Sequence, residues 1–127
     1  MNFHNKQLVG ATIVGGWDEW RGGQVYACPI GGTISAQKWT TDGSGSTYIW
    51  GYLDAAYKEN FTQEQAEEFV KEGIALAMAR DGSSGGIIRL VTVNKAGSKH
   101  QYIQGEHVPL FQGELPFPQQ QETMVLG

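Results

Sequence analysis

The stretch TQEQAEEFVKEGIALAMARDGSSGGIIRLVTV, residues 62–93, decides the fold class, because a helical pattern passes through a glycine-rich turn into a strand pattern. Thr62 followed by Gln65 fits a capping box, and Asp81 with the next glycine is typical of a helix end. We therefore predict a helix over residues 62–80. Its apolar residues recur at helical spacing and predict one buried stripe, with Lys71 and Glu72 outside it: Ala66, Phe69, Val70, Gly73, Ile74, Ala77 and Met78.

On the C-terminal side of this helix, β-branched residues predict a strand over residues 87–93. A polar turn then leads into a second strand, over residues 99–103. The prolines and glutamines beyond this point favour an extended tail. We assign residues 1–111 to one domain, which the family resemblance given below implies is partial, and residues 112–127 to the tail.

On the N-terminal side, two apolar runs separated by a Gly-Gly turn predict a hairpin with strands over residues 8–17 and 24–30. A weak alternation follows over residues 33–39. Residues 46–57 space their apolar side chains as a helix does, in spite of Gly51. Hairpins imply antiparallel pairing, and two helices can cover only one face of such a sheet, so the pattern predicts an α+β fold with one sheet face left bare.

Composition excludes several classes of function. The 9 Lys and Arg against 13 Asp and Glu give a net charge of −4, which argues against binding to nucleic acid. No apolar run is long enough to span a membrane, and the first residues do not resemble a signal peptide. Cys28 is the single cysteine and cannot form an internal disulfide, which favours a reducing compartment.

Several motifs suggest chemistry but lack the necessary context. Residues 82–86 satisfy the G-x-S-x-G pattern of a serine-hydrolase elbow, but a helix precedes them and a strand follows, which reverses the order that the elbow requires. His4, His100, His107 and Cys28 are not spaced as metal ligands. We therefore expect neither a metal nor another cofactor.

Asp81 is the most informative polar residue. It follows directly after a helix, where the helix dipole disfavours a negative charge. Two interpretations remain open from the residues alone: a solvated acidic residue in a turn, or a carboxylate held there for function. The turn of residues 43–46, GSGS, precedes the shorter predicted helix and lacks the lysine of a phosphate-binding loop, which favours tight packing of a helix end.

Four blocks of sequence match a known family in order and spacing. The chain resembles catalytic beta subunits of the proteasome, of the caspase-like type or its immunoproteasome counterpart, from about Leu8 to Phe111. The matching blocks are residues 16–18 (GWD), 22–26 (GGQVY), 43–54 (GSGSTYIWGYLD) and 80–90 (RDGSSGGIIRL).

This resemblance implies the C-terminal portion of a four-layer N-terminal nucleophile hydrolase sandwich, in which helices flank two antiparallel sheets. It implies a complete protein that is a threonine endopeptidase cutting after acidic residues, in ubiquitin-dependent degradation. It also implies polypeptide substrates, partner alpha and beta subunits in stacked heptameric rings, and a location in cytoplasm and nucleus.

The family pattern places three supporting residues around the nucleophile, and they correspond to Ser44, Asp81 and Ser84. The nucleophilic threonine itself is expected to be absent. Gly32-Thr33 imitates the self-cleavage site of the family, but the positions of the matching aspartate and lysine hold Ile49 and Gln65. Two hypotheses remain: a fragment of a threonine protease subunit, or a short structural or assembly-modulating product without activity.

Overall fold

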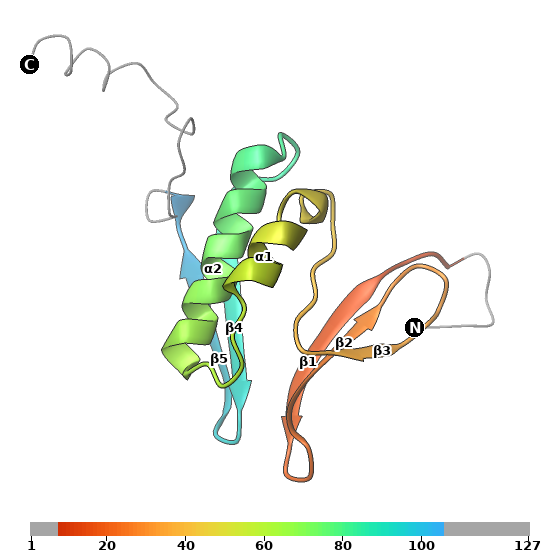
Figure 1. The fold of residues 1–127 in the computed structure, drawn as a ribbon, viewed down its shortest axis with the longest axis vertical. Helices are drawn as coiled ribbons and strands as arrows, with labels where there is room; N and C mark the ends of the chain where they lie inside the picture. The colour runs from red at the N-terminus through yellow and green to blue at the C-terminus, as the bar shows by residue number, and fades with distance from the viewer. Residues whose placement is uncertain (1–7, 106–127) are drawn as a thin grey trace, which may run out of the picture.

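The computed structural model describes residues 8–105, in which five strands and two α-helices follow one another (Figure 1). In chain order the elements are β1 (Thr12–Asp18), β2 (Gly22–Cys28), β3 (Ser35–Gln37), α1 (Trp50–Ala56), α2 (Gln63–Arg80), β4 (Ile88–Asn94) and β5 (Gly97–Ile103). The tail predicted over residues 112–127 lies outside the described residues. Within the described part, no helix has the length and apolar character needed to cross a membrane.

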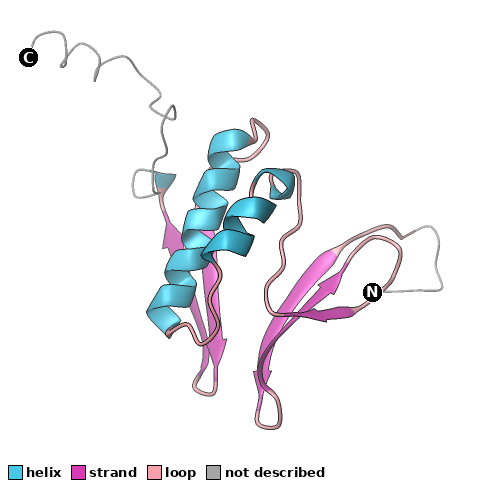
Figure 2. Cartoon of the chain, in the orientation of Figure 1, coloured by secondary structure: helices cyan, strands magenta, loops and turns pink. Residues whose placement is uncertain are grey.

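All strand pairs are antiparallel, as predicted. β1, β2 and β3 form one sheet in that order, and β4 pairs with β5 in a second sheet. α2 packs against β4 and α1 lies beside α2, while the β1–β2–β3 sheet stands to one side of the helices (Figure 2). The fold class is α+β, with two antiparallel sheets and two helices.

The start of α2 is fixed by the capping box that the sequence predicts. Thr62 Oγ1 accepts from the Gln65 amide at 3.2 Å, and Gln65 Oε1 accepts from the Thr62 amide at 3.0 Å. Two amide groups that the first helical turn leaves without partners are therefore satisfied within four residues. The helix ends at Arg80, where the prediction placed it.

The helix predicted over residues 46–57 is confirmed over Trp50–Ala56, but the first part of the segment is a separate 3₁₀ turn. Ser46–Tyr48 forms a 3₁₀ turn, and α1 begins only at Trp50. Ile49 joins them with φ −115°, outside the helical range, and its side chain is 2% exposed. The break in the helix accompanies the insertion of this side chain into the core.

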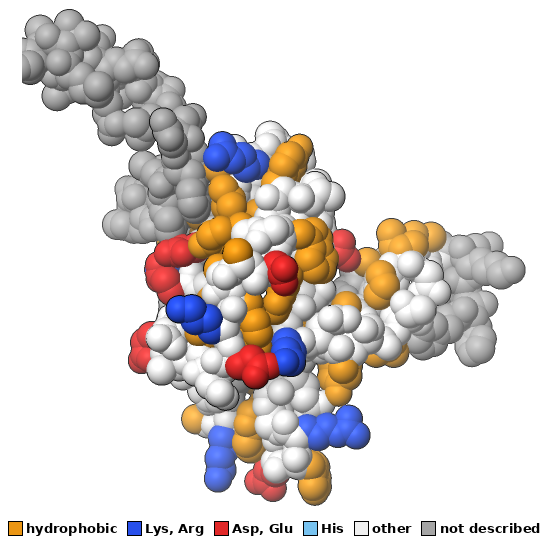
Figure 3. Space-filling view, in the orientation of Figure 1, with side chains coloured by type: hydrophobic (Ala, Val, Ile, Leu, Met, Phe, Trp, Pro, Cys, Tyr) orange, Lys and Arg blue, Asp and Glu red, His pale blue; other side chains and the backbone are white. Residues whose placement is uncertain are grey.

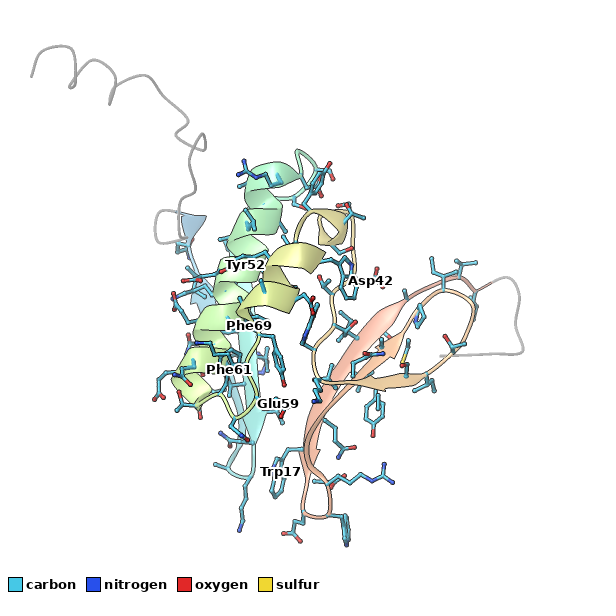
Figure 4. All side chains as sticks on the ribbon, in the orientation of Figure 1. Trp17, Asp42, Tyr52, Glu59, Phe61 and Phe69 are labelled. Atoms are coloured by element: carbon cyan, nitrogen blue, oxygen red, sulfur yellow. The ribbon has the colours of Figure 1, made fainter. Side chains whose placement is uncertain are left out.

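The core lies where α1 and α2 cross. Ile49, Leu53 and Ala77 are buried together, and partly buried aromatic and aliphatic side chains surround them: Trp39, Tyr52, Phe69 and Leu76. The helices approach closely at Gly73, where a Cβ atom would lie 2.9 Å from Leu53 Cδ2. Tyr52 on α1 reaches across to α2, and Phe61 lies beside Phe69 (Figure 4), with ring centroids 5.4 Å apart.

The continuous buried stripe predicted for α2 is wrong. Val70 and Ile74 are 42% and 43% exposed, whereas Ala75, outside the predicted stripe, is completely buried. Glu72 is half-buried and accepts a hydrogen bond from Tyr52. The helix packs on β4 and on α1, so its buried surface is rotated away from the side that faces the β1–β2–β3 sheet.

An apolar groove follows from this arrangement. It encloses about 450 Å³ and runs between the β1–β2–β3 sheet and α2. Four half-exposed aliphatic side chains line it: Ile13, Val70, Ile74 and Val91. Hydrophobic side chains also reach the surface over the helices and over the three-stranded sheet (Figure 3). The groove lies between a helix and a sheet, so the bare sheet face that the sequence predicts stays a prediction.

Candidate functional site

The candidate site lies where the loop before α1 meets the end of α2. Asp81 directly follows α2, and its amide donates to the Ala77 carbonyl at 2.9 Å. Asp81 is 8% exposed, and among residues 8–105 no other charged residue is buried. Because the negative end of the helix dipole also points here, the carboxylate needs several donors to remain ionised.

Serine hydroxyls supply most of these donors. Ser44 Oγ and Ser84 Oγ donate to Asp81 Oδ2, at 2.5 Å and 2.6 Å. Ser83 donates to Asp81 Oδ1 twice, from its backbone amide at 3.0 Å and from its hydroxyl at 2.8 Å. We call Ser44, Asp81, Ser83 and Ser84 the Asp81 cluster. Among the described residues, no buried side-chain nitrogen or oxygen lacks a hydrogen-bond partner.

These hydrogen bonds hold the pKa of Asp81 far below its ordinary value. The Ser44 hydroxyl has the largest effect, followed by the Ser84 hydroxyl and then by the amide and hydroxyl of Ser83, while burial opposes them. The carboxylate is therefore ionised throughout the neutral and mildly acidic range. Because Ser44 and Ser84 donate their hydroxyl protons to Asp81, their oxygen atoms keep lone pairs that can accept from a donor in front of the cluster.

Glycine residues allow the loop to come this close. A Cβ atom at Gly45 would lie 3.0 Å from Ala77 Cβ and 3.3 Å from Ser84 Oγ. Gly43 has φ +98°, a conformation that side chains strongly disfavour. The GSGS turn can therefore deliver Ser44 to Asp81, which lies 37 residues further along the chain. A cavity of about 360 Å³ opens beside the loop, with Ser44, Ser83 and Ser84 in its lining.

The structure brings together the three site residues that the sequence singles out, Ser44, Asp81 and Ser84. The sequence analysis missed Ser83, although the second position after an aspartate is where an Asx turn places its amide donor. Thr33 lies exposed in the loop between β2 and β3, and Ile49 is in the apolar core. Gln65 is engaged in the capping box.

Metal-binding residues do not gather in the described structure. Within residues 8–105, no group of three or more His, Cys, Asp or Glu side chains could hold an ion. His100 is exposed on β5, and Cys28 is buried at the end of β2. His4 and His107 lie outside the described residues.

Comparison with known proteins identifies the class. The model of the family described as "Proteasome subunit" matches residues 3–93, so the chain belongs to the proteasome subunit family. It is 50% identical over 111 residues to proteasome subunit beta type-9 of Mus terricolor, covering 87% of this chain and 50% of that protein. It is 42% identical over 114 residues to proteasome subunit beta type-6 of Arabidopsis thaliana, covering 89% of this chain and 49% of that protein.

A yeast relative agrees with these two. The probable proteasome subunit beta type-1 of Schizosaccharomyces pombe is 50% identical over 104 residues, which cover 81% of this chain and 46% of that protein. The chain thus spans about half the length of the curated relatives that it matches. The two antiparallel sheets and two helices described above fit an α+β fragment of the N-terminal nucleophile hydrolase type of fold.

Proposed function

We propose that this chain is the later half of a beta subunit of the 20S proteasome core particle. In its complete form the subunit is a threonine-type endopeptidase that cuts after acidic residues, in ubiquitin-dependent protein degradation. The observation that carries the proposal is the convergence of Ser44 and Ser84 on the buried carboxylate of Asp81. The resemblance of four sequence blocks to caspase-like subunits supports the acidic-site specificity.

The Asp81 cluster suits the chemistry of an N-terminal nucleophile. A free α-amine with a pKa near 8 acts as the base that takes the proton from the threonine hydroxyl. Serine lone pairs in front of Asp81 would accept hydrogen bonds from this amine and orient it. The ionised carboxylate behind them favours the protonated amine that forms as the hydroxyl attacks the substrate. This chain would supply these orienting groups, while the threonine, its aspartate and its lysine would come from the other half of the subunit.

We further propose that the subunit assembles with other alpha and beta subunits in stacked heptameric rings, acts on polypeptides, and works in cytoplasm and nucleus. The names of the relatives, proteasome subunits beta type-9 and beta type-6, support assembly into a proteasome. The exposed aliphatic side chains support it as well, because such surfaces are typical of chains that need a partner.

The test uses proteasome particles that contain a full-length subunit carrying Asp81→Asn. We expect hydrolysis of peptides with an acidic residue before the cleaved bond to fall by about a hundredfold, because removal of one preorganised charged group has effects of this size. Asp54→Asn is the matched control, since Asp54 is exposed on α1. Particles that assemble normally and keep their activity with Asp81→Asn would rule out the proposed role.

A second candidate function is favoured by the apolar groove. In this alternative, the chain is a short structural or assembly-modulating product that has no activity and binds partner subunits through its open apolar surface. The two candidates differ in the gene, because the first requires an exon with the threonine nucleophile upstream of Met1. A transcript that starts at Met1 and a chain that enters particles without restoring activity would favour the second.

A further inference from the structure

We propose that Ser83 is a positioning residue for the reaction, acting through Asp81. This inference rests on the proposed function, because it concerns the same cluster. It adds Ser83 to the supporting residues of the site. The supporting residues of the family pattern correspond only to Ser44, Asp81 and Ser84.

The hydrogen bonds divide between the two carboxylate oxygens. Ser44 and Ser84, the two residues that would face the reacting amine, both donate to Oδ2. Among residues 8–105, Ser83 alone donates to Oδ1, through its amide and its hydroxyl. Its hydroxyl oxygen also lies 3.2 Å from Ser44 Oγ. Ser83 is thus in contact with both the carboxylate and one of the serines that the carboxylate orients.

This division determines how firmly the carboxylate is held. The terminal torsion of an aspartate is soft and roughly two-fold, so donors on one oxygen leave rotation of the carboxylate plane poorly restrained. A second pair of donors on Oδ1 fixes that plane. Ser44 and Ser84 then find Oδ2 at a constant position, which keeps their own lone pairs directed at the same point in front of the cluster.

The local turn does not need the Ser83 hydroxyl. The amide of Asp81 bonds to Ala77 O, the amide of Ser84 bonds to Asp81 O at 3.0 Å, and the amide of Ser83 bonds to Asp81 Oδ1. Two backbone–backbone bonds and one bond to the Asp81 carboxylate therefore close this turn without the Ser83 hydroxyl. Ser83 is exposed, so its hydroxyl adds no core packing, and its effect is directed at the carboxylate.

The experiment compares particles that contain the full-length subunit with Ser83→Ala, Ser83→Thr or Ser98→Ala. Ser98 is an exposed serine of β5 and serves as the control. We expect Ser83→Ala to lower kcat for acidic-site peptides about tenfold, the effect of losing one hydrogen bond to a charged group, with KM changed less than about twofold. Ser83→Thr keeps the hydroxyl and should restore kcat, and Ser98→Ala should have no effect.

A double substitution separates positioning from a direct role. If Ser83 acts only through the carboxylate, Ser83→Ala should lower the residual kcat of Asp81→Asn particles by less than about twofold. Suppose that Asp81→Asn particles are inactive. The inference is then overturned if kcat of the Ser83→Ala particles lies within about twofold of kcat of the unsubstituted particles. Failure of Ser83→Ala to enter particles also overturns it, since that result means a structural role. Full activity of Asp81→Asn instead overturns the proposed function.

Discussion

The Asp81 cluster lies at the C-terminal end of α2, whereas the apolar groove runs along the middle of the helix, and the two differ in how far this chain completes them. In the Asp81 cluster, serines from two segments satisfy both oxygens of a buried carboxylate. In the groove, Ile13, Val70, Ile74 and Val91 face one another across open space. The donors to the Asp81 carboxylate are thus all present within the described residues, whereas the apolar packing beside α2 is incomplete.

The largest expected effect concerns the groove. We predict that residues 1–127, expressed alone, self-associate and unfold without a sharp cooperative transition. Each aliphatic side chain left half-exposed forfeits about half of the 1.5–3 kcal/mol that full burial provides, so the four together forfeit several kcal/mol, comparable with the ~5–15 kcal/mol net stability of a domain. Sedimentation velocity and thermal unfolding measure this directly, and a monomer with a sharp transition would contradict it.

Substitutions inside and outside the groove sharpen this prediction. Val70→Ser combined with Ile74→Ser should reduce self-association, because both side chains line the groove. Trp20→Ser is the control. Trp20 lies at the tip of the β1–β2 hairpin, away from the groove. It is 90% exposed, more than Val70 or Ile74. An equal reduction by Trp20→Ser would mean that general surface hydrophobicity drives association.

The next effect concerns the Asp81 cluster and the glycine beside it. Gly45→Ala would place a Cβ atom 3.0 Å from Ala77 Cβ, so the loop or its neighbour must give way by a few tenths of an ångström, and we expect this to disturb the hydrogen bond between Ser44 and Asp81. We expect acidic-site kcat in assembled particles to fall about tenfold, the effect of losing a hydrogen bond to a charged group. Gly51→Ala is the control, since a Cβ atom at that position in α1 meets no atom within 4 Å. Equal activities of the two variants would show that the close approach at Gly45 does not position the cluster.

The smallest effect concerns the contact between α1 and α2 that supports both regions. Tyr52 donates to Glu72 at 2.8 Å, and burial together with this hydrogen bond raises the pKa of Tyr52 to about 12. Because the folded pKa is raised, the stabilisation is fully present below about pH 10, the pKa of an unfolded tyrosine, and is lost as pH rises through the folded value. Tyr52→Phe should cost about 1 kcal/mol.

Heat inactivation of assembled particles measures this cost. The activity remaining after incubation at about pH 8 should be lower for Tyr52→Phe than for unsubstituted particles, and the difference should narrow as the incubation pH approaches that of the Tyr52 titration. Tyr102→Phe, at a residue 61% exposed on β5, should behave like the unsubstituted protein at each pH. A difference for Tyr52→Phe that persists unchanged at an incubation pH above that of the Tyr52 titration would exclude the hydroxyl as its source.

Much of the local structure could be predicted because its causes are local. The capping box at Thr62 and Gln65 acts within a single helical turn, and the hairpins follow from turns between neighbouring strands. The predicted strand limits differ from the observed ones by a few residues; β1, for example, begins at Thr12 rather than residue 8. The candidate residues Ser44, Asp81 and Ser84 came from the resemblance to the family, because no local pattern connects two segments that are 37 residues apart.

The sequence by itself determined the elements, their order and the antiparallel pairing, because helix caps, glycine turns and alternating side chains act over a few residues. Tertiary structure alone decided three things. It broke the helix at Ile49, whose side chain enters the core. It exposed Val70 and Ile74, because the β1–β2–β3 sheet does not close over that side of α2. It also directed Ser83 at the second oxygen of Asp81. Burial and hydrogen-bond direction depend on which elements meet in space, and a linear pattern does not contain that information.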